Sequence, residues 1–320
     1  MKYLFGPVNS RRLGLSQGID LIPEKVCNFN CIYCEVGATV RLTCERREYF
    51  PVDEIVAEID ALLVDPAAAA LDIFTVTASG EPTLHSGIGR IIRHIKERAA
   101  KPVAVLTNGA LLHLAEVREE LLAADLVIPS LDAAREESYR RINRPASCTR
   151  LGDIIDGLVR FGRQFSGEIW LEILLAKGIN DGDEDIDALC RAVASIAPAR
   201  VQLNTVVRPP LESFARPLAR EEMAAIAGRL PGRVEIIADF AGREHHSFRP
   251  VDAAEILEML RRRPCTGNDV SEALNFEPSL AIETLERMVA AGTVRQSAHL
   301  GKKYYQAGTA GAAGCGETSR

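Results

Sequence analysis

Three cysteines of this sequence have a spacing that could hold a metal centre: Cys27-x3-Cys31-x2-Cys34, with Tyr33 directly before the last one. Iron–sulfur clusters are held by cysteine thiolates, and a [4Fe–4S] cube normally takes four of them. Three protein thiolates would therefore leave one iron open to a cofactor or a substrate. The spacing predicts a catalytic metal centre rather than a closed structural one.

Two other uses of closely spaced cysteines compete with this interpretation. Structural zinc sites close with four ligands, and Cys44, ten residues after Cys34, could complete a zinc site with Cys27, Cys31 and Cys34. A disulfide within the motif is a weaker alternative, because nothing else in the sequence is typical of a secreted protein.

The run from Val26 to Cys34, VCNFNCIYC, resembles the cluster loop of the radical S-adenosylmethionine (radical SAM) enzymes, which typically reads Cys-x3-Cys-x-aromatic-Cys. The resemblance implies that the open iron of a [4Fe–4S] cluster binds the amine and carboxylate of S-adenosyl-L-methionine. An electron from the reduced cluster would cleave the sulfonium, and the released 5′-deoxyadenosyl radical would take a hydrogen from the substrate. The resemblance also implies an external one-electron reductant of the flavodoxin or ferredoxin type.

Length and composition bound the rest of the molecule. The 320 residues suffice for one barrel-sized domain and a small module, and 47% hydrophobic with 26% charged residues is typical of a globular protein. The net charge of −6 argues against a nucleic-acid surface over the whole molecule. Eight cysteines fit a reducing compartment, and the sequence shows neither a signal peptide nor a membrane-spanning run. We therefore expect a cytoplasmic protein without a membrane partner.

Strand-like and helical segments alternate through most of the chain, which is typical of βα units and a parallel sheet. The pattern also predicts a helix over 52–63. The expected strands cover residues 18–23, 72–78, 103–107, 126–131, 168–175 and 200–206, with an edge strand over 233–240. Six βα units are fewer than the eight of a complete barrel. The resemblance favours a partial (β/α)6 TIM-like barrel over residues 1–240, although periodicity alone leaves a flat, doubly wound α/β sheet open.

Candidate cofactor residues follow the predicted strands, where sites of such folds gather. Ser79-Gly80-Glu81-Pro82 comes directly after the second strand and resembles the Gly-Gly-Glu-Pro segment that meets the amino group of S-adenosylmethionine. Carbonyl groups and Glu81 can accept hydrogen bonds from an ammonium, and Gly80 would let the backbone come close. Taken alone, the segment would be an ordinary turn.

Further polar residues follow the next two strands. Asn108 ends the third, and Ser130 and Asp132 end the fourth, where they suit ribose hydroxyls and the cofactor carboxylate. Asn108-Gly109 is also a common turn, and Asp132 could cap the helix that follows it. The resemblance places the backbone of Tyr33 near the adenine.

Other segments resemble a branch of the superfamily related to the wyosine-type tRNA base-modifying enzymes. They are residues 5–14, 142–145, 203–205 and 208–210. Arg11 and Arg12 are candidate substrate-binding residues, because guanidinium groups grip phosphate or carboxylate; surface salt bridges are the alternative. The sequence does not identify the substrate, which could be RNA or protein.

The wyosine-forming enzymes carry additional cysteines upstream of the radical motif, and residues 1–26 contain none. The wyosine reaction is therefore an alternative only. The other cysteines stand singly, and a lone buried cysteine usually acts as a small hydrophobic residue. They are Cys44, Cys148, Cys190, Cys265 and Cys315.

A second module follows a predicted linker over 241–249, whose His245 and His246 lack a nearby partner ligand. Residues 250–306 predict three helices and a two-stranded wing, a winged-helix-like domain, and residues 307–320 predict a disordered tail. Eight basic and eight acidic residues balance in 249–306. This balance favours protein docking or covering of the barrel over DNA binding. A non-catalytic iron–sulfur sensor that binds DNA through this module is the alternative from another functional class.

Overall fold

The computed structural model describes residues 1–10, 12–238 and 250–308. It divides into two compact units, Met1–Gly242 and Arg243–Arg320. The predicted linker over 241–249, with His245 and His246, lies outside the described residues, as do Arg11, Cys315 and residues 309–320.

The first unit is an α/β fold whose described part contains an eight-stranded sheet in the order β1-β2-β5-β6-β7-β8-β9-β10. β1 is antiparallel to β2, and each later neighbour pairs in parallel. The strands of this sheet are β1 (Leu4–Ser10), β2 (Gly14–Asp20), β5 (Ile73–Thr77), β6 (Val103–Thr107), β7 (Leu126–Pro129), β8 (Glu168–Leu175), β9 (Arg200–Thr205) and β10 (Val234–Ile236). Two further strands, β3 (Val26–Cys27) and β4 (Arg41–Leu42), form a separate pair. The predicted α/β class with a mostly parallel central sheet is confirmed.

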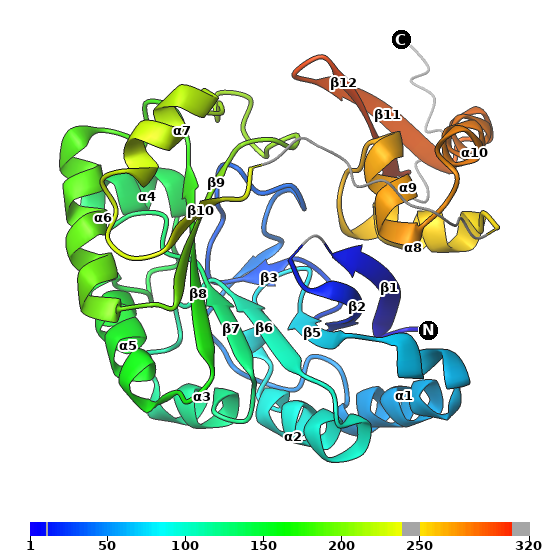
Figure 1. Cartoon of the computed structure of the whole chain (residues 1–320), viewed down its shortest axis with the longest axis horizontal. Coiled ribbons are helices and arrows are strands. Elements are labelled where there is room, and N and C mark those ends of the chain that lie inside the picture. The colour runs from blue at the N-terminus through cyan, green and yellow to red at the C-terminus, as the bar shows by residue number, and fades with distance from the viewer. Residues whose placement is uncertain (11, 239–249, 309–320) are drawn as a thin grey trace, which may run out of the picture. The chain divides into compact units, whose positions relative to one another are not determined.

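Helices cover the outer face of this curved sheet (Figure 1). They are α1 (Val52–Val64), α2 (Ile88–Ala99), α3 (Ala115–Leu121), α4 (Glu136–Asn143), α5 (Leu151–Gln164), α6 (Asp183–Ile196) and α7 (Arg220–Ala227), with short 3-10 helices η1 (Pro66–Ala70) and η2 (Pro82–Leu84). Crossover helices between parallel strands are the reason that strand-like and helical patterns alternate along the sequence. No helix in the described ranges combines the length and apolar character that crossing a bilayer requires.

Alternate residues of the strands build two different surfaces, because successive side chains point to opposite faces of a sheet. Phe74 and Val76 of β5 belong to the main core, which includes the buried residues of the helices. Ile73, with Ala104, Leu126 and Ile128 of the next strands, forms a separate apolar cluster on the inner face. Toward the carboxyl ends of the strands the same inner face becomes polar, and the candidate site is built there.

The second unit contains the predicted helices and strand pair. They are α8 (Ala253–Arg262), α9 (Gly267–Leu274), α10 (Pro278–Ala290), β11 (Val294–His299) and β12 (Lys302–Ala307). Ala307, which we predict to belong to the tail, is the last residue of β12. Lys303 and Tyr305 of β12 bind Glu286 of α10, at 2.9 and 2.6 Å. That this unit is a winged helix stays a prediction.

Candidate functional site

The cysteine loop leaves the sheet region through β3 and returns through β4. These two short strands pair in parallel, and the amide of Thr43 donates to the carbonyl of Cys27 at 3.0 Å. Within the loop, Cys34 N donates to Cys31 O at 3.2 Å, and Gly37 N to Cys34 O at 3.3 Å. Gly37 has a φ of +104°, which favours glycine. These consecutive turns hold Cys31 and Cys34 close in space.

A second chain segment, residues 142–146, lies along the cysteine loop; we call it the strap. Its carbonyl groups at Ile142 and Asn143 accept from the amides of Ile32 and Asn30 at 3.0 and 2.9 Å. Its Ala146 donates to Asn28 O at 2.8 Å. These bonds fix the backbone on both sides of Cys31.

The predicted cofactor segment Ser79–Pro82 also rests on the cysteine loop. Glu81 N donates to Val26 O at 3.0 Å, directly before Cys27. A Cβ built on Gly80 would lie 1.7 Å from Val26 O and 2.5 Å from Val26 C. Only glycine allows the two backbones to approach this closely. Ser79 in turn donates through Oγ to the Asp20 carboxylate at 2.8 Å.

Glu81 is buried, and four donors already occupy its carboxylate. Oε1 accepts from Thr83 N at 3.0 Å, Thr83 Oγ1 at 2.6 Å and Thr107 Oγ1 at 2.6 Å, and Oε2 accepts from Asn108 N at 2.7 Å. We predicted this residue as an acceptor for the cofactor ammonium. In the structure it joins the loops that follow β5 and β6.

Asp132 follows β7 and connects the end of this strand to the cysteine loop. Its Oδ2 accepts from Tyr33 Oη at 2.6 Å and from Asn143 Nδ2 at 2.7 Å, and its Oδ1 accepts from Leu174 N at 3.0 Å. Burial raises the pKa of Asp132 above its ordinary value although these donors lower it. Burial, followed by the neighbouring Asp132 carboxylate, raises the pKa of the Tyr33 phenol.

Ser130 lies beside Asp132 and differs from it in having an unused side chain. The residue bridges to Glu172 of β8, and within the described residues its hydroxyl makes no hydrogen bond. It lies on the same face of its strand as Ile128 of the inner cluster. The hydroxyl is therefore available to a ligand.

Arg12 is partnered inside the chain. Its Nη1 donates to Glu172 Oε2 at 2.9 Å and to Gln202 Oε1 at 2.7 Å. The arginines of two other candidate segments are paired as well, Arg144 with Glu212 and Arg208 with Glu35. An anionic substrate would have to compete with these carboxylates for each guanidinium.

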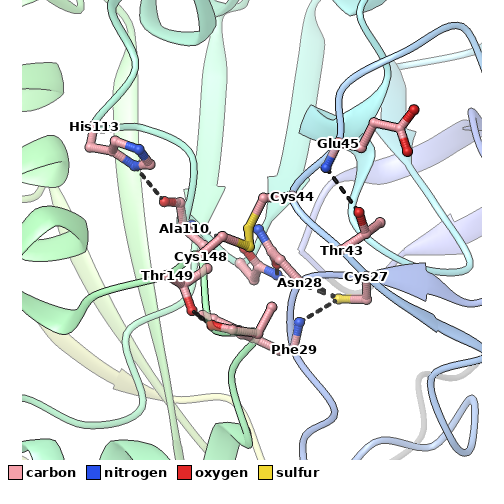
Figure 2. The surroundings of a disulfide bond; sticks show 12 residues. Cys27, Asn28, Phe29, Thr43, Cys44, Glu45, Ala110, His113, Cys148 and Thr149 are labelled. Atoms are coloured by element: carbon pink, nitrogen blue, oxygen red, sulfur yellow. Dashed lines mark hydrogen bonds between the residues drawn. A yellow bond between two sulfur atoms is a disulfide. The ribbon is translucent and has the colours of Figure 1, made fainter.

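Two cysteines that we predicted as single residues are joined. Cys44 and Cys148 form a disulfide across 104 residues, with Cα atoms 6.3 Å apart. Figure 2 shows the disulfide among Thr43, Asn28 and Thr149. It connects the loop after β4 to the chain just beyond the strap. The two cysteines are far apart in the sequence, so their spacing does not predict that they pair. Because Cys44 is bonded to Cys148, it does not serve as a fourth zinc ligand here.

The three motif cysteines are free thiols. Burial raises the pKa of Cys27 to about 12 and the pKa of Cys31 well above its ordinary value, and neighbouring motif thiols contribute to both shifts. Among the described residues, no group of His, Cys, Asp or Glu side chains is arranged to hold a single metal ion.

An iron–sulfur cluster fits this donor set. Its cysteine ligands are spread over separate irons rather than gathered on one ion. Metal ligation deprotonates a coordinating thiol, which offsets the raised pKa values. Beside Cys27, the buried Nδ2 of Asn28 has no hydrogen-bond partner in the described structure, although cluster and thiolate sulfurs would be acceptors for it.

We expect Glu81→Gln to lower the free energy of unfolding by about 1–3 kcal/mol, because an amide donor would then face one of the four donors. Urea denaturation of both proteins measures the difference. Burial also raises the pKa of Glu81 above its ordinary 4.5. Between the ordinary pKa and the raised one, the native carboxyl keeps a proton that the unfolded chain has lost, so this residue's contribution to stability falls as pH rises through that window, and above it the native group is the carboxylate that accepts four donors. If the free energy of unfolding changed with pH in the same way in both proteins, the result would contradict this expectation.

Removing the disulfide should weaken the fold and spare the metal centre. We expect Cys44→Ser with Cys148→Ser to lower the free energy of unfolding by about 2–4 kcal/mol, because a long loop is no longer closed in the unfolded chain. Iron bound per chain should stay at the wild-type level, since neither residue is a ligand in this account. Iron analysis beside urea denaturation measures both effects, and loss of iron would make one of the two cysteines a ligand.

The sequence pointed to the residues at the strand ends but not to the residues that hold them. Asp20 fixes Ser79, and Asn180 donates to the carbonyls of Asp132 and Leu174 at 2.7 and 2.8 Å. Asn143 lies in a segment that we had singled out, but its contact with Asp132 depends on the fold. Asp20 lies inside the first predicted strand, whereas Asn180 and Asn143 read as ordinary turn and helix-end residues.

Known proteins are similar to this chain in sequence and in fold. The model of the radical SAM superfamily matches residues 21–190. A protein named GTPase Obg from Brachyspira hyodysenteriae is 37% identical over 298 residues, which are 92% of this chain and 44% of that protein. This chain thus spans less than half of that relative.

A UPF0026 protein of Methanocaldococcus jannaschii is 30% identical over 310 residues, covering 95% of this chain and 96% of the relative. A solved radical SAM methyltransferase from Sphaerobacter thermophilus has the same fold, with a TM-score of 0.51 at 20% identity over 69% of this chain and 66% of that one. With its matching family model, its cysteine motif and its sheet, this chain belongs to the radical SAM superfamily of enzymes.

Proposed function

We propose that this enzyme reductively cleaves S-adenosyl-L-methionine at a [4Fe–4S] cluster held by Cys27, Cys31 and Cys34. The observation that carries the proposal is the set of three free thiols on one loop, fixed by backbone bonds on both sides. When bound, the cluster supplies one electron to the sulfonium, and a 5′-deoxyadenosyl radical is released for hydrogen abstraction.

The protein's own contribution is to orient the cofactor. We assign the backbone of Ser79–Pro82 and the hydroxyl of Ser130 to direct contacts with it, and the backbone of Tyr33 to the adenine. Glu81 and Asp132 would act by holding the loops, because their oxygens already accept internal bonds.

A one-electron reductant of the flavodoxin or ferredoxin type is the partner that this chemistry requires. The non-catalytic sensor is disfavoured by membership in a family of enzymes. The wyosine-type reaction is disfavoured by the absence of cysteines from residues 1–26. We also do not propose an activity on GTP from the similarity to the protein named GTPase Obg, because the sequence contains no G-x-x-x-x-G-K-[ST] motif.

The test is electron paramagnetic resonance of the anaerobically reconstituted and reduced protein, recorded before and after S-adenosylmethionine is added. We expect a signal of a reduced [4Fe–4S] cluster whose g values change on addition, because the cofactor binds the open iron. A cluster signal that is insensitive to the cofactor would contradict the proposal. Zinc in place of iron would overturn it.

A further inference from the structure

Two asparagine side chains direct their amide nitrogens at the motif thiols. Nδ2 of Asn108 lies 3.6 Å from Sγ of Cys27, and Nδ2 of Asn143 lies 3.5 Å from Sγ of Cys31. Both distances are within the range of N–H···S hydrogen bonds. The two residues come from different elements, the loop after β6 and the end of α4.

The amide of Asn108 is held at both of its ends. Its Oδ1 accepts from Ala110 N at 3.0 Å, which is the local turn expected of an Asn-Gly sequence. Its Nδ2 also donates to Oδ1 of Asn28 at 2.5 Å. The oxygen therefore faces the turn, and the nitrogen faces Cys27.

The amide of Asn143 uses its two N–H groups on two different acceptors. One donates to Oδ2 of Asp132 at 2.7 Å, and the other is directed at Cys31. The residue is only 3% exposed, and its carbonyl accepts from Asn30 N at 2.9 Å. Asp132 thereby fixes the donor that faces the thiol.

We propose that Asn108 and Asn143 are positioning residues that raise the reduction potential of the cluster by donating to two of its three thiolates. The inference rests on the proposed function, since it requires the cluster on these cysteines. Reduction adds one negative charge, and fixed N–H donors beside the thiolates stabilise that charge. Partners of this kind around metal ligands tune the metal as well as orienting the ligands.

The experiment is a redox titration of the reconstituted cluster in Asn108→Ala and Asn143→Ala, followed by paramagnetic resonance. We expect the equilibrium constant for reduction to fall by about tenfold in each, which is about 59 mV to more negative potential for one electron. Asn204→Ala is the matched control, because its amide donates to Glu172 at 3.1 Å instead of to a thiol. Unchanged potentials in both test variants would overturn the inference.

A second measurement uses the wild-type chain and so does not depend on how the variants fold. Protein labelled with 15N in the asparagine side-chain amides should show 15N hyperfine coupling to the reduced cluster in pulsed resonance spectra. Absence of that coupling would overturn the inference. Failure of the wild type to assemble a cluster would instead contradict the proposed function. Normal cofactor cleavage together with unchanged reduction potentials in the two asparagine variants would contradict only the roles of the asparagines.

Discussion

Replacing any one of Cys27, Cys31 and Cys34 by alanine should reduce bound iron from about four per chain to near zero. The three thiols lie on one loop whose backbone is fixed by β3, β4 and the strap, so this backbone would have to move before another group of the loop could take the place of a missing thiol. Iron and sulfide analysis after anaerobic reconstitution measures the loss.

Cys190→Ala is the matched control for this series. Cys190 is also a free cysteine of the first unit, but it lies on α6 and its thiol contacts the carbonyl of Arg229. Wild-type iron in this variant would show that the losses are specific to the motif. A motif variant that kept a full complement of iron would contradict the assignment of ligands.

Gly80→Ala should damage both the fold and the metal site. The added Cβ would lie 1.7 Å from Val26 O, and backbone atoms on both sides must then move. Overpacking of this kind typically costs 1–3 kcal/mol or more, and the displaced residue is directly next to Cys27. We expect the free energy of unfolding, measured by urea denaturation, to be lower by about 3 kcal/mol. We also expect iron analysis to show a large loss of bound iron.

Gly152→Ala supplies the comparison, because a Cβ at Gly152 of α5 meets nothing within 4 Å. Alanine is favoured over glycine within a helix by about 0.5–1 kcal/mol, so this variant should be unchanged or slightly more stable. If Gly80→Ala had the same free energy of unfolding and the same bound iron as Gly152→Ala, the close approach between the cofactor segment and the cysteine loop would not contribute to the stability or to the metal site.

The sequence predicted the strands well where local signals agree. β6 and β8 begin and end at the predicted residues, since each is a run of strand-forming residues bounded by turn formers. β1 was missed as a strand, because Gly6 and Pro7 within it are residues that strands avoid. Its place in the sheet comes from pairing with β2, which no local pattern shows.

The candidate site was predictable in position but not in its internal contacts. Carboxyl ends of parallel strands meet at one edge, so the residues after β5 and β7 could be assigned to it. That Glu81 and Asp132 are occupied by internal donors depends on residues from several loops. The Cys44–Cys148 pair has the same character, because 104 residues separate its members and only the fold brings them together.

The proposed function requires that Cys27, Cys31 and Cys34 hold a cluster at which S-adenosylmethionine is cleaved. The most direct measurement is the amount of 5′-deoxyadenosine formed under anaerobic conditions by reconstituted protein with dithionite and S-adenosylmethionine. We expect product from the wild type and from Cys190→Ala, and only the level of a protein-free reaction from Cys31→Ala. Equal product from Cys31→Ala and the wild type, or none from a wild type whose cluster is intact and reduced, would contradict the account.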